Sequence, residues 1–147
     1  MSEQDYGVRP QPGWFDLLSL IIGGMIDNAG EEESHAFLQG IGENLAARYP
    51  LPAARSVQDL ETQVNLVLAR FNWGFADIQP QQNAVVIHHL AMPASDGSLE
   101  QGRWQTALAA VLCGLYGRWL REQGGSPTVP LLCDSAAQDS TLTFRYQ

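Results

Sequence analysis

Residues 71–90 read FNWGFADIQPQQNAVVIHHL, and the spacing of the apolar residues changes within this stretch. Before it, apolar side chains recur every three or four positions, which is typical of a helix. From Trp73 to Ile78 neighbouring residues alternate with a period of two, residues 80–83 are turn formers, and residues 84–90 form a β-branched apolar run. The stretch therefore predicts the end of a helix followed by a β-hairpin with a short loop.

Helices are predicted on both sides of this hairpin. Before it, Ser56 to Asp59 has the pattern of a capping box with Ser56 as the N-cap. The apolar residues that follow keep a period of 3.6: Val57, Leu60, Val64, Val67, Leu68 and Phe71. After the hairpin, residues 103–123 predict a long helix that ends at Gly124-Gly125. Its apolar face consists of Trp104, Leu108, Val111, Leu112, Leu115 and Trp119.

The C-terminal residues predict two more strands. Residues 128–133 form an apolar strand-like run, and residues 134–139 contain turn-forming side chains. Residues 141–146 alternate apolar and polar side chains, which indicates a half-buried closing strand.

Two further helices are predicted near the N-terminus, over residues 13–28 and from Glu31 to Tyr49. The second helix starts with three glutamates and carries apolar residues at i, i+4 spacing: Phe37, Ile41, Leu45 and Tyr49. In the first helix, apolar residues cover most of the circumference, so more than one side needs cover. In a small domain another subunit often supplies the second cover, which indicates an oligomer.

The order of elements, ααα-ββ-α-ββ, predicts an α+β protein. We expect a small antiparallel sheet covered by helices on one face, with oligomerisation through the N-terminal helices. Residues 1–12 are polar, contain Pro10 and Pro12, and are predicted to form an extended arm. Residues 13–147 are predicted to form a single domain.

Composition excludes several classes of partner. The chain has 147 residues, a formal net charge of -8, eight arginines and no lysine. Nucleic acid and anionic lipid are therefore not expected as partners, because both are bound by clustered cations. Glu3 and Asp5 stand where a secretory signal needs positive charge, so a cytoplasmic location is predicted. The longest apolar stretch, residues 14–26, is shorter than the roughly 20 residues that span a bilayer, so no membrane insertion is expected.

The residues themselves do not indicate catalysis, a metal or a cofactor. His88 and His89 are neighbours in a strand and point to opposite faces, so one is expected to pack inward and the other to face solvent. No nucleophile elbow, phosphate-binding loop or paired carboxylate site is recognisable. Gly114 and Gly117 are interpreted as a site of close helix packing. Trp104 and Trp119 are interpreted as core residues rather than as sugar-stacking platforms.

Three stretches resemble the D component of bacterial cellulose synthase. They are IDNAG at residues 26–30, FNWGF at residues 71–75 and LCGLYGRW at residues 112–119. The resemblance implies a non-catalytic accessory subunit that forms a homo-octameric ring, built as a tetramer of dimers. It also implies that the ring promotes crystalline cellulose by arranging synthase complexes, with other synthase subunits or an accessory protein as partners. The residues that carry the resemblance are given structural roles: Asn72, Trp73, Gly74, Gly114, Tyr116, Gly117, Arg118 and Trp119.

In this family the N-terminal arms line the interior of the ring, where glucan chains are thought to pass. On this chain, Tyr6 or Trp14 could stack on a glucan, and Arg9 and Gln11 could supply hydrogen bonds. A protein partner for the arm is the alternative. A protein without a signal fits an organiser on the cytoplasmic side, and a periplasmic glucan guide is the other possibility. The remaining alternatives are an oligosaccharide-binding module and, third, a glycan hydrolase.

Negative charge is concentrated in the N-terminal part of the chain. Ten of the sixteen carboxylates lie within residues 1–61, against three arginines. This distribution favours a basic or polar partner segment, whose binding should weaken as salt rises. Arg118 is expected to pair with a carboxylate of this N-terminal half.

Overall fold

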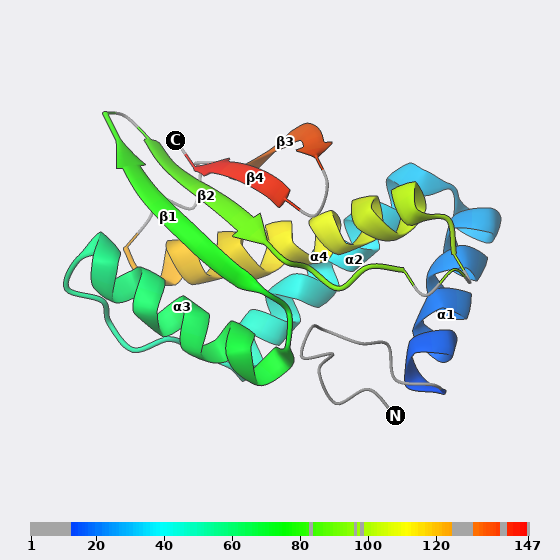
Figure 1. The fold of residues 1–147 in the computed structure, drawn as a ribbon, viewed down its shortest axis with the longest axis horizontal. Coiled ribbons are helices and arrows are strands. Elements are labelled where there is room, and N and C mark those ends of the chain that lie inside the picture. The colour runs from blue at the N-terminus through cyan, green and yellow to red at the C-terminus, as the bar shows by residue number, and fades with distance from the viewer. Residues whose placement is uncertain are drawn as a thin grey trace, which may run out of the picture.

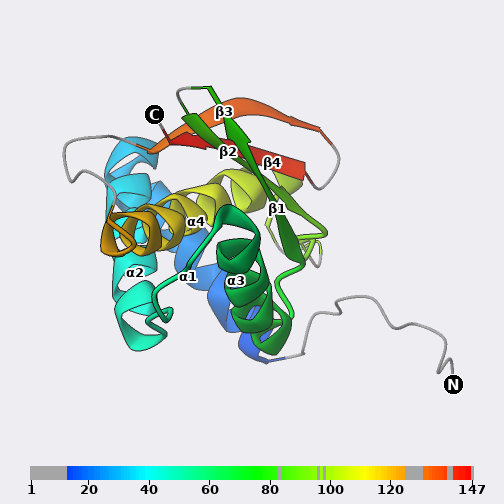
Figure 2. The same cartoon turned by 90° about the vertical axis from the view of Figure 1, so that its left-hand side faces the viewer.

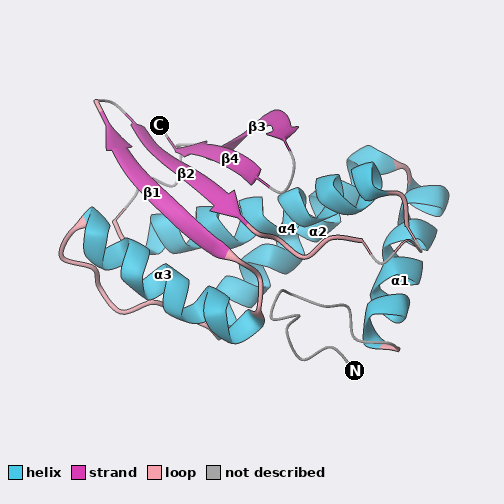
Figure 3. Ribbon diagram, viewed as in Figure 1, coloured by secondary structure: helices cyan, strands magenta, loops and turns pink. Residues whose placement is uncertain are grey.

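The computed structural model describes residues 13–82, 84–95, 97, 99–124, 131–138 and 141–146, and within 131–138 only the side chain of Leu131. The predicted arm, residues 1–12, lies outside the described residues. Figure 1 and Figure 3 show four helices and four strands. The helices are α1 (Trp14–Ala29), α2 (Glu31–Arg48), α3 (Val57–Phe71) and α4 (Gln101–Glu122). The strands are β1 (Phe75–Gln81), β2 (Ala84–Leu90), β3 (Leu131–Gln138) and β4 (Thr141–Tyr146).

The four strands form one antiparallel sheet in the order β1-β2-β4-β3. The predicted hairpin is confirmed, with Phe75 opposite Leu90 and Gln81 opposite Ala84. The predicted turn over residues 134–139 is wrong, because β3 continues to Gln138. Pairing with β4 overrides the turn-forming residues, and a register shift between Asp134 and Gln138 accommodates the extra length of β3.

All four helices lie on one side of the sheet, as Figure 2 shows with the sheet above them. The α+β class and the predicted order of elements are thus confirmed. α4 contacts β3 and β4, α3 contacts β1, and α2 packs along α4, with α1 against α2 and α4. α4 carries most of the core, and both Trp104 and Trp119 are buried as predicted. Among the described helices, none combines the length and apolar character needed to cross a membrane.

α2 and α4 approach each other at two glycines. A Cβ atom on Gly114 would lie 1.9 Å from the Gln39 carbonyl oxygen, and one on Gly42 would lie 1.9 Å from the Val111 carbonyl oxygen. The interpretation of Gly114 as a site of close helix packing is therefore confirmed. For Gly117 it is wrong, because the nearest atom to a Cβ there is a guanidinium nitrogen of Arg121 at 3.2 Å.

The close contact decides which face of α2 is buried. The side that packs inward carries mostly small residues: Ser34, Leu38, Gly42 and Ala46. Phe37 and Ile41, from the apolar series of the sequence, instead point away and are 59% and 40% exposed. α2 therefore buries a narrow small-residue face and leaves large apolar side chains at the surface.

α3 holds the edge strand β1 through side chains. The Asn65 amide donates to the Ala76 carbonyl at 2.9 Å and accepts from the Ala76 N–H at 2.7 Å. Glu61 accepts from the Ile78 N–H at 2.7 Å. These bonds satisfy backbone groups that an edge strand otherwise exposes to pairing with another chain.

Candidate functional site

The Asn72-Trp73-Gly74 stretch makes the turn from α3 into β1. Asn72 adopts the left-handed conformation (φ 58°), which asparagine tolerates better than most residues, and the Trp73 N–H donates to the Leu68 carbonyl at 3.1 Å. Gly74 has φ 80°, and a Cβ there would lie 2.0 Å from the Leu90 carbonyl oxygen. The turn therefore needs glycine both for its backbone angle and for the close approach to the end of β2.

A buried histidine locks this turn onto α4. His89 lies 2.6 Å from the Trp73 carbonyl oxygen through Nε2 and 2.5 Å from the Tyr116 hydroxyl through Nδ1. A carbonyl only accepts, so Nε2 carries the proton and Nδ1 accepts from Tyr116. The neighbouring His88 is partly exposed and lies 3.2 Å from the Thr143 hydroxyl. The expected division into one inward and one outward histidine is confirmed.

Burial shifts the pKa values of both partners in this bond. It lowers the pKa of His89 from 6.5 to about 4, although the hydrogen bond to Trp73 opposes the change. Burial also raises the pKa of Tyr116 above its usual range. Both side chains are therefore neutral at physiological pH, as a structural lock requires.

We expect the free energy of unfolding to fall as the pH drops from about 6.5 to about 4. The unfolded chain takes up a proton on His89 in this window whereas the folded chain does not, so acid favours the unfolded state. The shift corresponds to about 3 kcal/mol, all of it present above pH 6.5 and lost at pH 4. Urea unfolding between pH 7 and pH 4 measures it, because the His89→Gln variant lacks this part of the pH dependence.

His88→Gln is the matched control for this prediction. It changes a histidine next to His89 whose ring is partly exposed, and it should retain the wild-type dependence on pH. An unchanged pH dependence in His89→Gln would show that the buried ring does not carry the effect.

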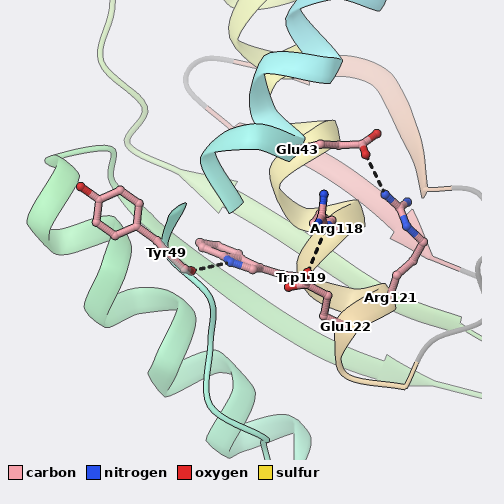
Figure 4. Close-up of polar contacts among 6 residues, drawn as sticks. All are labelled: Glu43, Tyr49, Arg118, Trp119, Arg121 and Glu122. Atoms are coloured by element: carbon pink, nitrogen blue, oxygen red, sulfur yellow. Dashed lines mark hydrogen bonds and ion pairs between the residues drawn. The ribbon is translucent and has the colours of Figure 1, made fainter. Parts of the chain in front are cut away.

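The C-terminal end of α4 is tied to α2 by polar contacts (Figure 4). The Trp119 indole N–H donates to the Tyr49 carbonyl at 2.9 Å, and Arg121 pairs with Glu43 at 3.2 Å. Arg118 pairs with Glu122, one turn along its own helix, at 2.8 Å. The expected pairing of Arg118 with the N-terminal half is therefore wrong, because the helical phase gives that contact to Arg121.

An aromatic groove lies between α1, the end of α3 and the start of α4. We use this name for the hollow of about 300 Å³ whose walls include Trp14, Phe15, Phe71, Trp73 and Trp104. Phe15 and Trp104 form its base, with ring centroids 4.7 Å apart. The groove brings together Trp14, predicted as an arm contact, and the Asn72-Trp73 turn, which the sequence separates by 58 residues or more.

A second hollow of about 430 Å³ opens beside this groove. It lies between α1, α2 and α4 and shares Leu18, Trp73 and Leu108 with the aromatic groove. Its other walls are mainly apolar and include Ile22, Ile41 and Leu45. α1 therefore covers the rest of the chain incompletely along its length.

Large apolar side chains gather on the outer sides of α1 and α2. We call these residues the apolar face: Trp14, Leu17, Leu18, Leu20, Ile21, Phe37 and Ile41, each at least 40% exposed. Together they expose several hundred Å² of apolar surface, which is the size of a functional patch on a soluble protein. The sequence indicated that α1 needs a second cover, but it did not indicate that α2 contributes to the same face.

The described residues offer little for chemistry. Among them no three histidine, cysteine, aspartate or glutamate side chains gather as a metal site would require. Tyr6, Arg9 and Gln11 lie outside the described residues, so their predicted contacts stay predictions. Tyr116 and Trp119 lie in the core, Arg118 lies at the surface, and the site that remains is an interaction surface.

Comparison with known proteins gives consistent matches. Residues 5–147 match the sequence profile of the cellulose synthase family that is described by its D component. Two proteins named cellulose synthase operon protein D, from Komagataeibacter xylinus and Komagataeibacter sucrofermentans, are each 35% identical over 103 residues, or 68% of this chain. A further K. xylinus protein of that name is 33% identical over the same length. The aligned part of the chain spans 64% of the length of these relatives.

Proposed function

The chain belongs to the cellulose synthase operon protein D family, and from this premise we propose that it is a non-catalytic scaffold of the cellulose-secretion machinery. In this proposal copies of the chain assemble through the apolar face into a ring, an octamer built from dimers. The ring arranges synthase complexes and thereby promotes ordered, crystalline cellulose. Its partners are further copies of itself and other synthase subunits or an accessory protein.

The observation that carries the proposal is the apolar face. Trp14 and Leu20 are 75% and 71% exposed, although each is large and apolar. Leaving such residues in water forfeits about 25 cal/mol for each Å² that could be buried. A second copy of the same chain offers a face of matching size and chemistry, and a two-fold contact would cover both at once.

Light scattering coupled to size-exclusion chromatography tests the assembly. At micromolar concentration we expect a single species of about eight times the 16.1 kDa chain mass. The apolar contact should persist at high salt, because burial of apolar surface is not screened. A mass of one chain at every concentration would overturn the proposal.

The location and the effect on cellulose need a test in cells. We propose that the scaffold works on the cytoplasmic side, where it would contact synthase subunits rather than a free glucan. A tagged chain should then lie with the synthase complexes and resist protease added to intact spheroplasts. Loss of the chain should lower the crystallinity of the secreted cellulose, measured by X-ray diffraction, more than its amount.

Oligosaccharide binding is the second candidate function. The observation that favours it is the aromatic groove, because flat rings such as Trp14 and Trp73 are suited to stacking on sugar rings. Titration calorimetry with cello-oligosaccharides tests this function. An absence of heat at millimolar ligand would remove it and leave the scaffold proposal intact.

A further inference from the structure

The aromatic groove lies where the described part of the chain begins. Trp14 is the first residue of α1 and forms one wall of the groove, and Gly13 joins it to the twelve residues before. An extended chain spans at most about 3.6 Å per residue, so twelve residues reach roughly 40 Å. The N-terminal segment is therefore long enough to reach any part of a groove that starts at its own attachment point.

The segment has the sequence pattern of a ligand for such a groove. Residues 5–12 read DYGVRPQP, in which apolar and polar or small residues alternate. In extended form one side carries Tyr6, Val8, Pro10 and Pro12. Prolines preset an extended backbone at low entropic cost, and proline-containing segments characteristically dock in grooves lined by aromatic side chains. The family match begins at residue 5, so it includes this segment.

We propose that residues 5–12 of the chain occupy its own aromatic groove, with Pro10 and Pro12 against the aromatic walls. A hollow of about 300 Å³ is at the small end of ligand sites, which suits a few side chains of an attached segment. Attachment through Gly13 supplies the segment at high effective concentration, so weak contacts are sufficient to hold it. An oligosaccharide or a partner segment would then enter the groove only by displacing the arm.

Tryptophan fluorescence of the full chain tests this proposal. Three of the four tryptophans, Trp14, Trp73 and Trp104, line the groove, whereas Trp119 is buried beside Tyr49. The test variant replaces the apolar side of the arm by serine: Tyr6→Ser, Val8→Ser, Pro10→Ser and Pro12→Ser. With excitation at a wavelength that tyrosine does not absorb, we expect acrylamide quenching to increase at least twofold.

The matched control replaces the polar side of the same segment, with Asp5→Ser, Arg9→Ser and Gln11→Ser. It should quench like the wild type, because the proposal assigns the contact to the apolar side alone. Equal quenching in all three proteins would overturn the proposal, and so would an equal increase in both variants. A synthetic peptide of residues 4–13 should restore protection to the apolar-side variant, whereas the peptide with Pro10→Ser and Pro12→Ser should not.

The mass of each sample separates this inference from the proposed assembly. If quenching rises in the apolar-side variant while its mass stays that of the wild type, the arm covers the groove. If quenching rises only where the mass falls, a second copy covers the groove, and the inference fails while the scaffold proposal stands. If every sample is a single chain and quenching still differs, the scaffold proposal fails and the inference stands.

Discussion

Replacing Gly114 by alanine is expected to destabilise the protein by about 3 kcal/mol or more. The added Cβ would lie 1.9 Å from the Gln39 carbonyl oxygen and 2.9 Å from its carbonyl carbon, both of them backbone atoms of α2. No side chain can rotate away to relieve that contact, so α2 must move as a unit against α4. Overpacking in a well-packed core costs typically about 1–3 kcal/mol, and a forced separation of two helices lies at the upper end of that range.

Gly117→Ala is the matched control on the same helix. Its Cβ would meet a guanidinium nitrogen of Arg121 at 3.2 Å, and that nitrogen is the far end of a flexible side chain. Alanine also favours a helix over glycine by up to about 1 kcal/mol, so this variant should be neutral or slightly more stable. Urea unfolding monitored by circular dichroism compares the two. Equal midpoints for both variants would mean that the helices do not approach as closely as the structure indicates.

A double replacement tests whether the two glycines serve the same contact. Gly42→Ala should also destabilise strongly, because its Cβ would lie 1.9 Å from the Val111 carbonyl oxygen. Once one alanine has separated the helices, the second has less left to disrupt, so the two effects should not add. Fully additive losses would place the two glycines in independent contacts.

The elements with a regular apolar period were predictable from the sequence, and the contacts between elements were not. The period from Val57 to Phe71 places α3, and the alternation that follows it places β1. In α2 the buried side carries Gly42 and Ala46, which add little to any apolar pattern. Sequence alone could not reveal that face, because its reason is the space left by Gly114 on another helix.

The candidate site shows the same division. Strand alternation predicts that one of two adjacent histidines points inward, but the choice of His89 depends on the Tyr116 hydroxyl of α4. Arg118 and Arg121 differ by less than one helical turn, and only the packing of α2 decides which one reaches Glu43. The aromatic groove joins residues from both halves of the chain, so neither half indicates it alone.

The double replacement of Leu20 and Ile21 by glutamate is expected to abolish the proposed assembly without unfolding the chain. The two side chains are 71% and 50% exposed within one chain, so glutamate meets water there and the fold loses little. At a contact between copies, the same carboxylates would be buried without partners, at a cost of several kcal/mol. In a two-fold contact each change counts twice, so the dissociation constant should rise at least about 1000-fold, or about 4 kcal/mol.

Leu66→Glu is the matched control, because Leu66 is a leucine of similar exposure, 64%, that lies on α3 outside the apolar face. It adds a negative charge to an already acidic chain, so it also tests whether general charge repulsion rather than the local contact disrupts assembly. Light scattering should report the wild-type mass for Leu66→Glu and a single chain for the Leu20→Glu/Ile21→Glu variant, with similar thermal unfolding for both. Loss of assembly in Leu66→Glu as well would assign the effect to charge. Retention of the full mass in the double variant would mean that the apolar face is not where the copies meet.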